Sequence, residues 1–179
     1  MNEPLLFFPL AVMSTATSVG LRPSLALTIP LISSSLTVFY AIVEPTIFLP
    51  FINAAKVDAP AANKTVRLWW KDFLPAGLVT VFTIGLTGVA GGINAATHFP
   101  HYSLPRKLCF AGAAFSAGHF AYGYHISQVI KSICDEEEEK KGRSMEYVKK
   151  WLRVHLQRTL LTDLPALVCF AWVAFGPRG

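Results

Sequence analysis

The segment Tyr40-Ala-Ile-Val-Glu-Pro-Thr-Ile-Phe-Leu-Pro50 carries one carboxylate, Glu44, in an otherwise apolar run. Together with the apolar residues that precede it, this run is long enough to cross a membrane as a helix. An ionisable side chain at that depth costs about 2.5–3.5 kcal/mol for Asp on insertion scales, and it usually faces a partner or a cavity. Glu44 is therefore the first candidate functional residue.

Four apolar blocks lie near residues 25–52, 73–96, 108–131 and 152–175. Each is about as long as the roughly 20 residues that a helix needs to cross the hydrocarbon core. Only 15% of the chain is charged, against about 25% in a typical soluble domain, and the blocks lack the polar alternation of a membrane barrel. The sequence predicts an all-α integral membrane protein, in which residues 25–179 form one domain of four transmembrane helices.

Residues 1–24 form a separate N-terminal segment that is apolar at first and then rich in small polar residues. Its start, Met-Asn-Glu, lacks the basic residues of a signal peptide. We expect an interfacial helix here, and a fifth, short or re-entrant span is the alternative.

Basic residues concentrate in the loops 53–72 and 131–151. Because Lys and Arg in short loops mark the cytoplasmic side, both loops are predicted to be cytoplasmic. The net charge of +5 follows from this bias, and no basic patch interleaved with aromatics indicates a nucleic-acid partner. The expected surroundings are the lipid bilayer.

Two further patterns concern packing. Trp69, Trp70 and Trp151 stand at the starts of the second and fourth blocks, which is typical of interfacial aromatic anchors. Gly88 and Gly92 form a small-xxx-small pattern that lets another helix approach closely. Such glycine faces would also permit a homodimer.

Polar side chains recur inside the third and fourth blocks. His119, Tyr122 and His125 are spaced three apart, so neighbouring pairs share a helix face. His155 and Arg158 are also three apart, and Asp163 lies deeper in the same block.

Glu44 is predicted to pair with Arg158, because an unpaired carboxylate and an unpaired guanidinium would both be costly inside a membrane. A purely structural role, in which the pair fixes the register of the helices, is the alternative. The number of polar groups favours a functional cluster, and the sequence leaves the protonation state of Glu44 open.

Motifs for cofactors are few. His98 and His101 are three apart, but Pro100 argues against helical presentation and no nearby cysteine or carboxylate completes a metal site. Nucleotide-binding, metalloprotease and haem-attachment motifs do not occur. We expect neither a metal nor a tightly bound organic cofactor.

Three short motifs resemble the anthrone oxygenase-like family of small four-helix membrane proteins, which is abundant in fungi. They are Val43-Glu44-Pro45, Leu68-Trp69-Trp70-Lys71-Asp72-Phe73 and Trp151-Leu-Arg-Val-His155-Leu-Gln-Arg158. The resemblance covers roughly residues 25–175. It implies an enzyme of polyketide secondary metabolism that acts on a lipophilic aromatic substrate, and by analogy with fungal pathway enzymes it implies the endoplasmic reticulum membrane.

The reaction that this resemblance implies is oxidation of an anthrone-type carbon to a quinone, with molecular oxygen as co-substrate and no metal or flavin. Such a reaction needs a base and a group that stabilises the resulting anion. On this reading His119 is the base, Arg158 stabilises the anion and Tyr122 positions a phenol. The full set of candidate catalytic residues is Glu44, His119, Tyr122, Arg158 and Asp163. The candidate substrate contacts are Tyr40, Trp70, His125 and His155.

Two other functions use the same sequence differently. Glu44 and Asp163, with Arg158 or a histidine, could perform acid–base work such as epoxide opening, cyclisation or isomerisation. Oxygen dependence separates this chemistry from the oxygenase. A non-catalytic membrane scaffold or transporter, which docks partners through the loop 131–150, is the third possibility.

Overall fold

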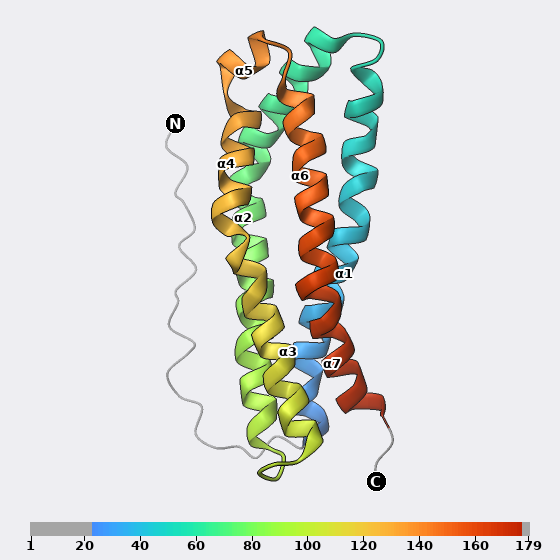
Figure 1. The fold of residues 1–179 in the computed structure, drawn as a ribbon, viewed down its shortest axis with the longest axis vertical. Coiled ribbons are helices and arrows are strands. Elements are labelled where there is room, and N and C mark those ends of the chain that lie inside the picture. Colours follow the sequence, from blue (N-terminus) through green and yellow to red (C-terminus); the bar gives the residue numbers. More distant parts are fainter. Residues whose placement is uncertain (1–22, 177–179) are drawn as a thin grey trace, which may run out of the picture.

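The computed structural model describes residues 23–176, and over that range it is an elongated bundle of helices (Figure 1). The helices are α1 (Pro23–Ala54), α2 (Ala59–Thr97), α3 (Leu104–Ala121), α4 (Gly123–Cys134), α5 (Glu136–Lys140), α6 (Ser144–Arg158), η1 (Thr159–Asp163) and α7 (Leu164–Phe175). No strand occurs in this range, so the predicted all-α class is confirmed. Apart from its last two residues, the N-terminal segment 1–24 lies outside the described residues.

Three helical stretches are long and apolar enough to cross a membrane. They are Leu25–Ala54, Ala59–Thr97 and the continuous run Ser144–Phe175, which joins α6, η1 and α7. The block predicted as the third span, 108–131, is instead divided between α3 and α4, which are separated at Tyr122. These three candidate spans indicate a helical membrane protein.

The first basic loop is much shorter than predicted, because α2 begins at Ala59. Asp58 caps this helix by accepting a hydrogen bond from the backbone N–H of Ala61 at 3.0 Å, and Pro60 occupies its first turn. Both features are strong signals for a helix start. Most of the predicted loop 53–72 is therefore helical.

The predicted loop 131–151 is also largely helical, since it contains α5 and the start of α6. In this acidic turn Arg143 donates to Glu138 Oε1 at 2.6 Å, and this bond lowers the pKa of Glu138. Glu139 forms an ion pair with Arg67 of α2. Figure 1 shows α5 at the same end of the bundle as the turn between α1 and α2.

Glycines of α2 allow the close helix packing that the sequence predicted. A Cβ on Gly88 would lie 2.9 Å from Ser33 Oγ of α1, and one on Gly92 would lie 2.8 Å from the ring of Phe170 of α7. A side chain at either position would force its neighbour to shift. The glycine face of α2 is thus used within the chain.

Aromatic side chains of α1, α2 and α6 gather into what we call the aromatic cluster. Its members are Phe48, Trp69, Trp70, Phe73 and Trp151. Phe48 stacks on Trp70 at a centroid distance of 5.3 Å and packs edge-on against Trp151 at 5.0 Å. Trp70 and Trp151 are only 3% and 4% exposed, so these two pack within the bundle rather than on its surface, where interfacial anchors usually lie. The longer α2 places Trp70 inside the bundle, facing α1 and α6.

Candidate active site

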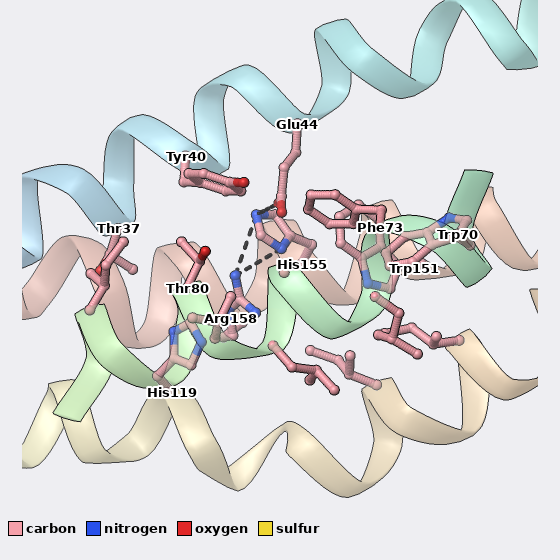
Figure 2. A pocket seen from close by; sticks show the side chains of 17 residues that line it. Thr37, Tyr40, Glu44, Trp70, Phe73, Thr80, His119, Trp151, His155 and Arg158 are labelled. Carbon is pink, nitrogen blue, oxygen red and sulfur yellow. Dashed lines mark hydrogen bonds and ion pairs between the residues drawn. The ribbon is translucent and has the colours of Figure 1, made fainter. Parts of the chain in front are cut away.

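A cavity lies beside the aromatic cluster, lined by residues of α1, α2, α3, α4 and α6 (Figure 2). Trp70, Phe73 and Trp151 line one end of it, and aliphatic side chains of α2 and α4 line much of the rest beside a group of polar residues. The space open to the centres of water molecules is about 110 Å³, several times the roughly 10–15 Å³ that one water needs. A small lipophilic molecule or part of a larger one fits such a space.

Glu44 reaches into this cavity from α1 and meets His155 of α6. The carboxylate oxygen Oε2 lies 2.5 Å from His155 Nε2. Arg158 Nη2 lies closer to the other ring nitrogen, at 2.8 Å from Nδ1 and 3.4 Å from Nε2. A guanidinium only donates hydrogen bonds, so we assign Nδ1 as the acceptor and place the proton of the neutral ring on Nε2, toward Glu44.

The predicted direct pairing of Glu44 with Arg158 is therefore wrong, because His155 lies between them (Figure 2). His155 stacks on Trp151, at a centroid distance of 4.9 Å and an interplanar angle of 25°. Trp151 belongs to the aromatic cluster, so this packing fixes the plane of the imidazole. The ring is held where it can contact the carboxylate and the guanidinium together.

A second histidine and carboxylate pair joins α3 to η1. His119 Nδ1 lies 2.8 Å from Asp163 Oδ1, which also accepts a hydrogen bond from Thr162 Oγ1 at 3.2 Å. An ionised carboxylate only accepts, so the proton of His119 lies on Nδ1. The other ring nitrogen, Nε2, has no hydrogen-bond partner among residues 23–176. Since His119 lines the cavity, Nε2 is a basic nitrogen suited to the contents of that cavity.

Arg158 connects the two pairs, since its Nε lies 3.4 Å from Asp163 Oδ2. We call the five connected side chains the polar network. Its members are Glu44, His119, His155, Arg158 and Asp163. All five are less than 9% exposed. Two carboxylates and one guanidinium leave one negative charge while both histidines are neutral, and one added proton makes the network neutral. Charges of opposite sign are thus buried together, and each carboxylate lies beside a histidine.

The π-helical turn η1 brings Arg158 and Asp163 to the same side of their helix. Residues five apart in an α-helix point in clearly different directions, because each residue turns the chain by about 100°. In η1 the backbone N–H of Leu164 bonds to the carbonyl of Thr159, five residues back, and π-turns of this kind often occur at functional sites. Pro165 follows, and it has no N–H for the carbonyl four residues earlier. Pro165 was the one sequence signal for this irregular turn.

The structure does not bring all predicted site residues together. Tyr40 and Trp70 line the cavity with the polar network, whereas Tyr122 and His125 line a separate groove with Gln157. The break between α3 and α4 at Tyr122 ends the regular spacing on which a shared face with His119 depends. Sequence reasoning also missed Phe73 and Trp151 as lining residues. Two sequence features could have indicated them. Phe73 follows Trp70 by three positions on α2, and Trp151 precedes His155 by four positions, so each pair shares a helix face.

A search of the described residues finds no group of three or more His, Cys, Asp or Glu side chains placed to hold a metal ion. The two carboxylates of the polar network each face a histidine instead. The arrangement is thus one of paired proton donors and acceptors around an apolar cavity.

The chain is similar to three curated fungal proteins. It is 28% identical to the probable epoxidase scpX of Mollisia scopiformis, with 79% of this chain and 89% of that protein covered. It is 26% identical to the epoxidase pydX of an Acremonium species (82% and 90% covered) and 27% identical to the epoxidase gkaX of Penicillium citrinum (90% and 98% covered). No protein-family model and no solved structure matches the chain. All three names concern epoxides, and this is consistent with a biosynthetic enzyme of oxidation.

Proposed function

We propose that the protein is a membrane-embedded enzyme of fungal secondary metabolism that oxidises a lipophilic substrate and forms an epoxide. The observation that carries this proposal is the polar network, in which two histidine and carboxylate pairs and one arginine are buried beside an otherwise apolar cavity. The three fungal relatives named epoxidases support it, because the similarity extends over most of their length.

The roles follow from the positions of the protons. His119 Nε2 removes a proton from an acidic O–H or C–H of the substrate, and the Nδ1–H bond to Asp163 stabilises the imidazolium that results. Arg158 stabilises the substrate anion. The proton that His155 holds toward Glu44 is available to the reduced oxygen species as it leaves.

The oxidant in this proposal is molecular oxygen, and the substrate supplies the electrons. The substrate anion adds oxygen to give a hydroperoxide, whose outer oxygen attacks the neighbouring C=C bond or leaves as water. For a hydroquinone the balance closes: one oxygen atom enters the epoxide, the other becomes water, and the ring loses two hydrogens to become a quinone. An anthrone-type CH₂ gives a C=O and water by the same steps. An electron-rich aromatic polyketide is therefore the substrate class that we propose.

The membrane arrangement belongs to the same proposal. We place α3 and α4 as a fourth, broken span beside the three clear ones, in the endoplasmic reticulum, with α5 and the turn between α1 and α2 in the cytoplasm. The exposed side chains along α1 and α2 are mainly apolar, for example Phe39, Ile42 and Val79, and these suit contact with lipid. A lipophilic substrate would enter from the bilayer.

Labelled oxygen tests the reaction. Microsomes that contain the protein are supplied with candidate polyketides under ¹⁸O₂, and the mass of the product is measured by mass spectrometry. One ¹⁸O atom in each product molecule, and no product without oxygen, is the expected result. Unlabelled product that forms under strict anaerobiosis would rule out the oxygenase.

That anaerobic outcome would favour a second candidate, acid–base opening or cyclisation of an epoxide. The short contact between Glu44 and His155 favours this candidate, because a carboxyl group beside an imidazole can serve as a general acid toward an epoxide oxygen. Here the relatives' reaction would supply the substrate. Incubation with a lipophilic epoxide under nitrogen separates the two candidates.

A further inference from the structure

A second, smaller space lies behind the wall of the cavity, and we call it the rear chamber. Hydroxyl groups of α1 and α3 line it together with the His119 and Asp163 pair. The polar lining residues are Ser33, Ser34, Thr37, Ser116, His119 and Asp163. Thr37 and His119 also line the main cavity, so they form the wall between the two spaces. The volume open to the centres of water molecules is about 10 Å³, close to the roughly 10–15 Å³ that one water needs.

The hydroxyl groups of α1 present acceptors to this chamber. Ser33 Oγ donates to the carbonyl of Ile84 at 2.6 Å, Ser34 Oγ donates to that of Leu31 at 3.1 Å, and Thr37 Oγ1 donates to that of Ser33 at 3.0 Å. Each hydroxyl has only one proton. Each of these oxygens therefore has free lone pairs and can only accept a further hydrogen bond.

Asp163 adds a further acceptor. Its Oδ1 is engaged by His119 and Thr162, whereas Oδ2 makes no hydrogen bond to any residue between 23 and 176 and is only approached by Arg158 Nε at 3.4 Å. The residue is 3% exposed. A buried carboxylate oxygen without a hydrogen bond is costly, so a donor in the chamber would be favourable.

Gly88 of α2 makes the gathering of hydroxyls possible. Its missing Cβ would lie 2.9 Å from Ser33 Oγ and 3.4 Å from Ser116 Oγ. The two serines come from different helices and approach each other across this glycine. The hydroxyl lining is thus a feature that the packing of three helices creates.

We propose that the rear chamber binds one water molecule, which donates hydrogen bonds to Asp163 Oδ2 and to a hydroxyl oxygen of α1. A space of this size that is lined mainly by acceptors calls for a small molecule with two donors, and water is that molecule. The water holds Asp163 in place, and Asp163 keeps the His119 proton on Nδ1. His119 Nε2 therefore faces the main cavity as a base. This positioning role rests on the proposed function, whereas the water site itself does not.

Two substitutions at one position test the site. Ser116→Val fills the chamber with methyl groups, whereas Ser116→Ala leaves room and keeps the acceptors of α1. In crystals of the whole chain grown from a lipid phase, we expect density for a water at about 2.7–3.2 Å from Asp163 Oδ2 in the wild type and in Ser116→Ala. We expect none in Ser116→Val. A wild-type chamber without a water would overturn the proposal.

Turnover tests the positioning role separately. Loss of a hydrogen bond to a charged group predicts that Ser116→Val is about tenfold slower, with Ser116→Ala near the wild-type rate. It also predicts that the pH profile of Ser116→Val moves, which a purely structural defect would not cause. Ser127→Val, an exposed position on α4, is the control for added bulk. A wild-type rate and a wild-type pH profile in Ser116→Val would contradict the positioning role. A wild-type protein without any turnover would contradict the proposed function, and the crystal structures would then still decide whether the water site exists.

Discussion

The aromatic cluster and the polar network are buried side by side, and both join α1 to α6, but they are built differently. Phe48 has three ring partners within 5.0–5.3 Å, so each ring of the cluster is supported by others. The polar network is a single chain of contacts. Glu44 Oε2, Arg158 Nε and Asp163 Oδ2 lie at ion-pair distances within it but make no hydrogen bond of good geometry to the described residues. The rings of the cluster support one another, although Trp70 Nε1 also lacks a hydrogen bond to the described residues, whereas the polar network keeps several unpaired polar atoms that a ligand can engage.

The largest effect is expected from Arg158→Met. It leaves two buried carboxylates without their cation, and removal of one partner from a buried ion pair costs about 3–5 kcal/mol. We expect a much lower melting temperature in detergent and no detectable product. Arg153→Met, on the exposed face of the same helix, is the control.

A second change separates charge from shape at this position. Adding Glu44→Gln to Arg158→Met removes one of the uncompensated charges and should restore part of the stability without restoring turnover. A single Arg158→Met variant as stable as the wild type would show that the network carries no buried charge of this kind.

Phe48→Ala should affect the aromatic cluster and leave the polar network intact. Truncation of a buried Phe costs about 3–5 kcal/mol, and Phe48 is 1% exposed at the centre of the aromatic cluster. The melting temperature should fall, while turnover per folded molecule changes by less than about twofold, because Phe48 does not line the cavity. Phe39→Ala, on the exposed side of α1, is the matched control. A selective loss of turnover in Phe48→Ala would erase the distinction between the two regions.

Glu44→Gln should lower turnover and leave stability almost unchanged. The amide keeps the shape of the side chain and removes no hydrogen bond of good geometry, so we expect stability to change by about 1 kcal/mol or less. Loss of the carboxylate as proton acceptor and donor should lower turnover by about 100-fold. Glu146→Gln, exposed on α6, should be neutral in both assays. A stable Glu44→Gln enzyme with wild-type turnover would move the chemistry away from this residue.

The smallest effect is expected at a partly buried carboxylate outside the site, Glu138 of α5. The hydrogen bond from Arg143 lowers the pKa of Glu138, so this bond stabilises the fold above the ordinary carboxylate pKa, and the contribution is lost as the pH falls through the lowered value. The melting temperature of Glu138→Gln should therefore lie slightly below that of the wild type near neutral pH, and the difference should close in acid. A difference that is independent of pH would contradict this assignment.

The sequence predicted the helical membrane architecture because long apolar blocks leave few alternatives. It also identified Glu44, since a carboxylate in such a block is conspicuous. The partner of Glu44 was not predictable from charge alone, because the choice between Arg158 and His155 depends on where Trp151 holds the imidazole.

Two features of the site depend on irregular backbone, and regular spacing misses them. The π-turn places Asp163 beside Arg158, although the two are five positions apart. The break at Tyr122 sends His125 to a different groove from His119. Helical periodicity predicts shared faces only while the helix continues.

The central claim is that the polar network carries out an oxidation with molecular oxygen. The most direct measurement is the amount of ¹⁸O-labelled product formed under ¹⁸O₂ by the wild type, Glu44→Gln and Asp163→Asn at equal membrane protein levels. We predict one ¹⁸O per product molecule for the wild type and about 100-fold less labelled product for each variant. Labelled product at the wild-type level from both variants would contradict the account.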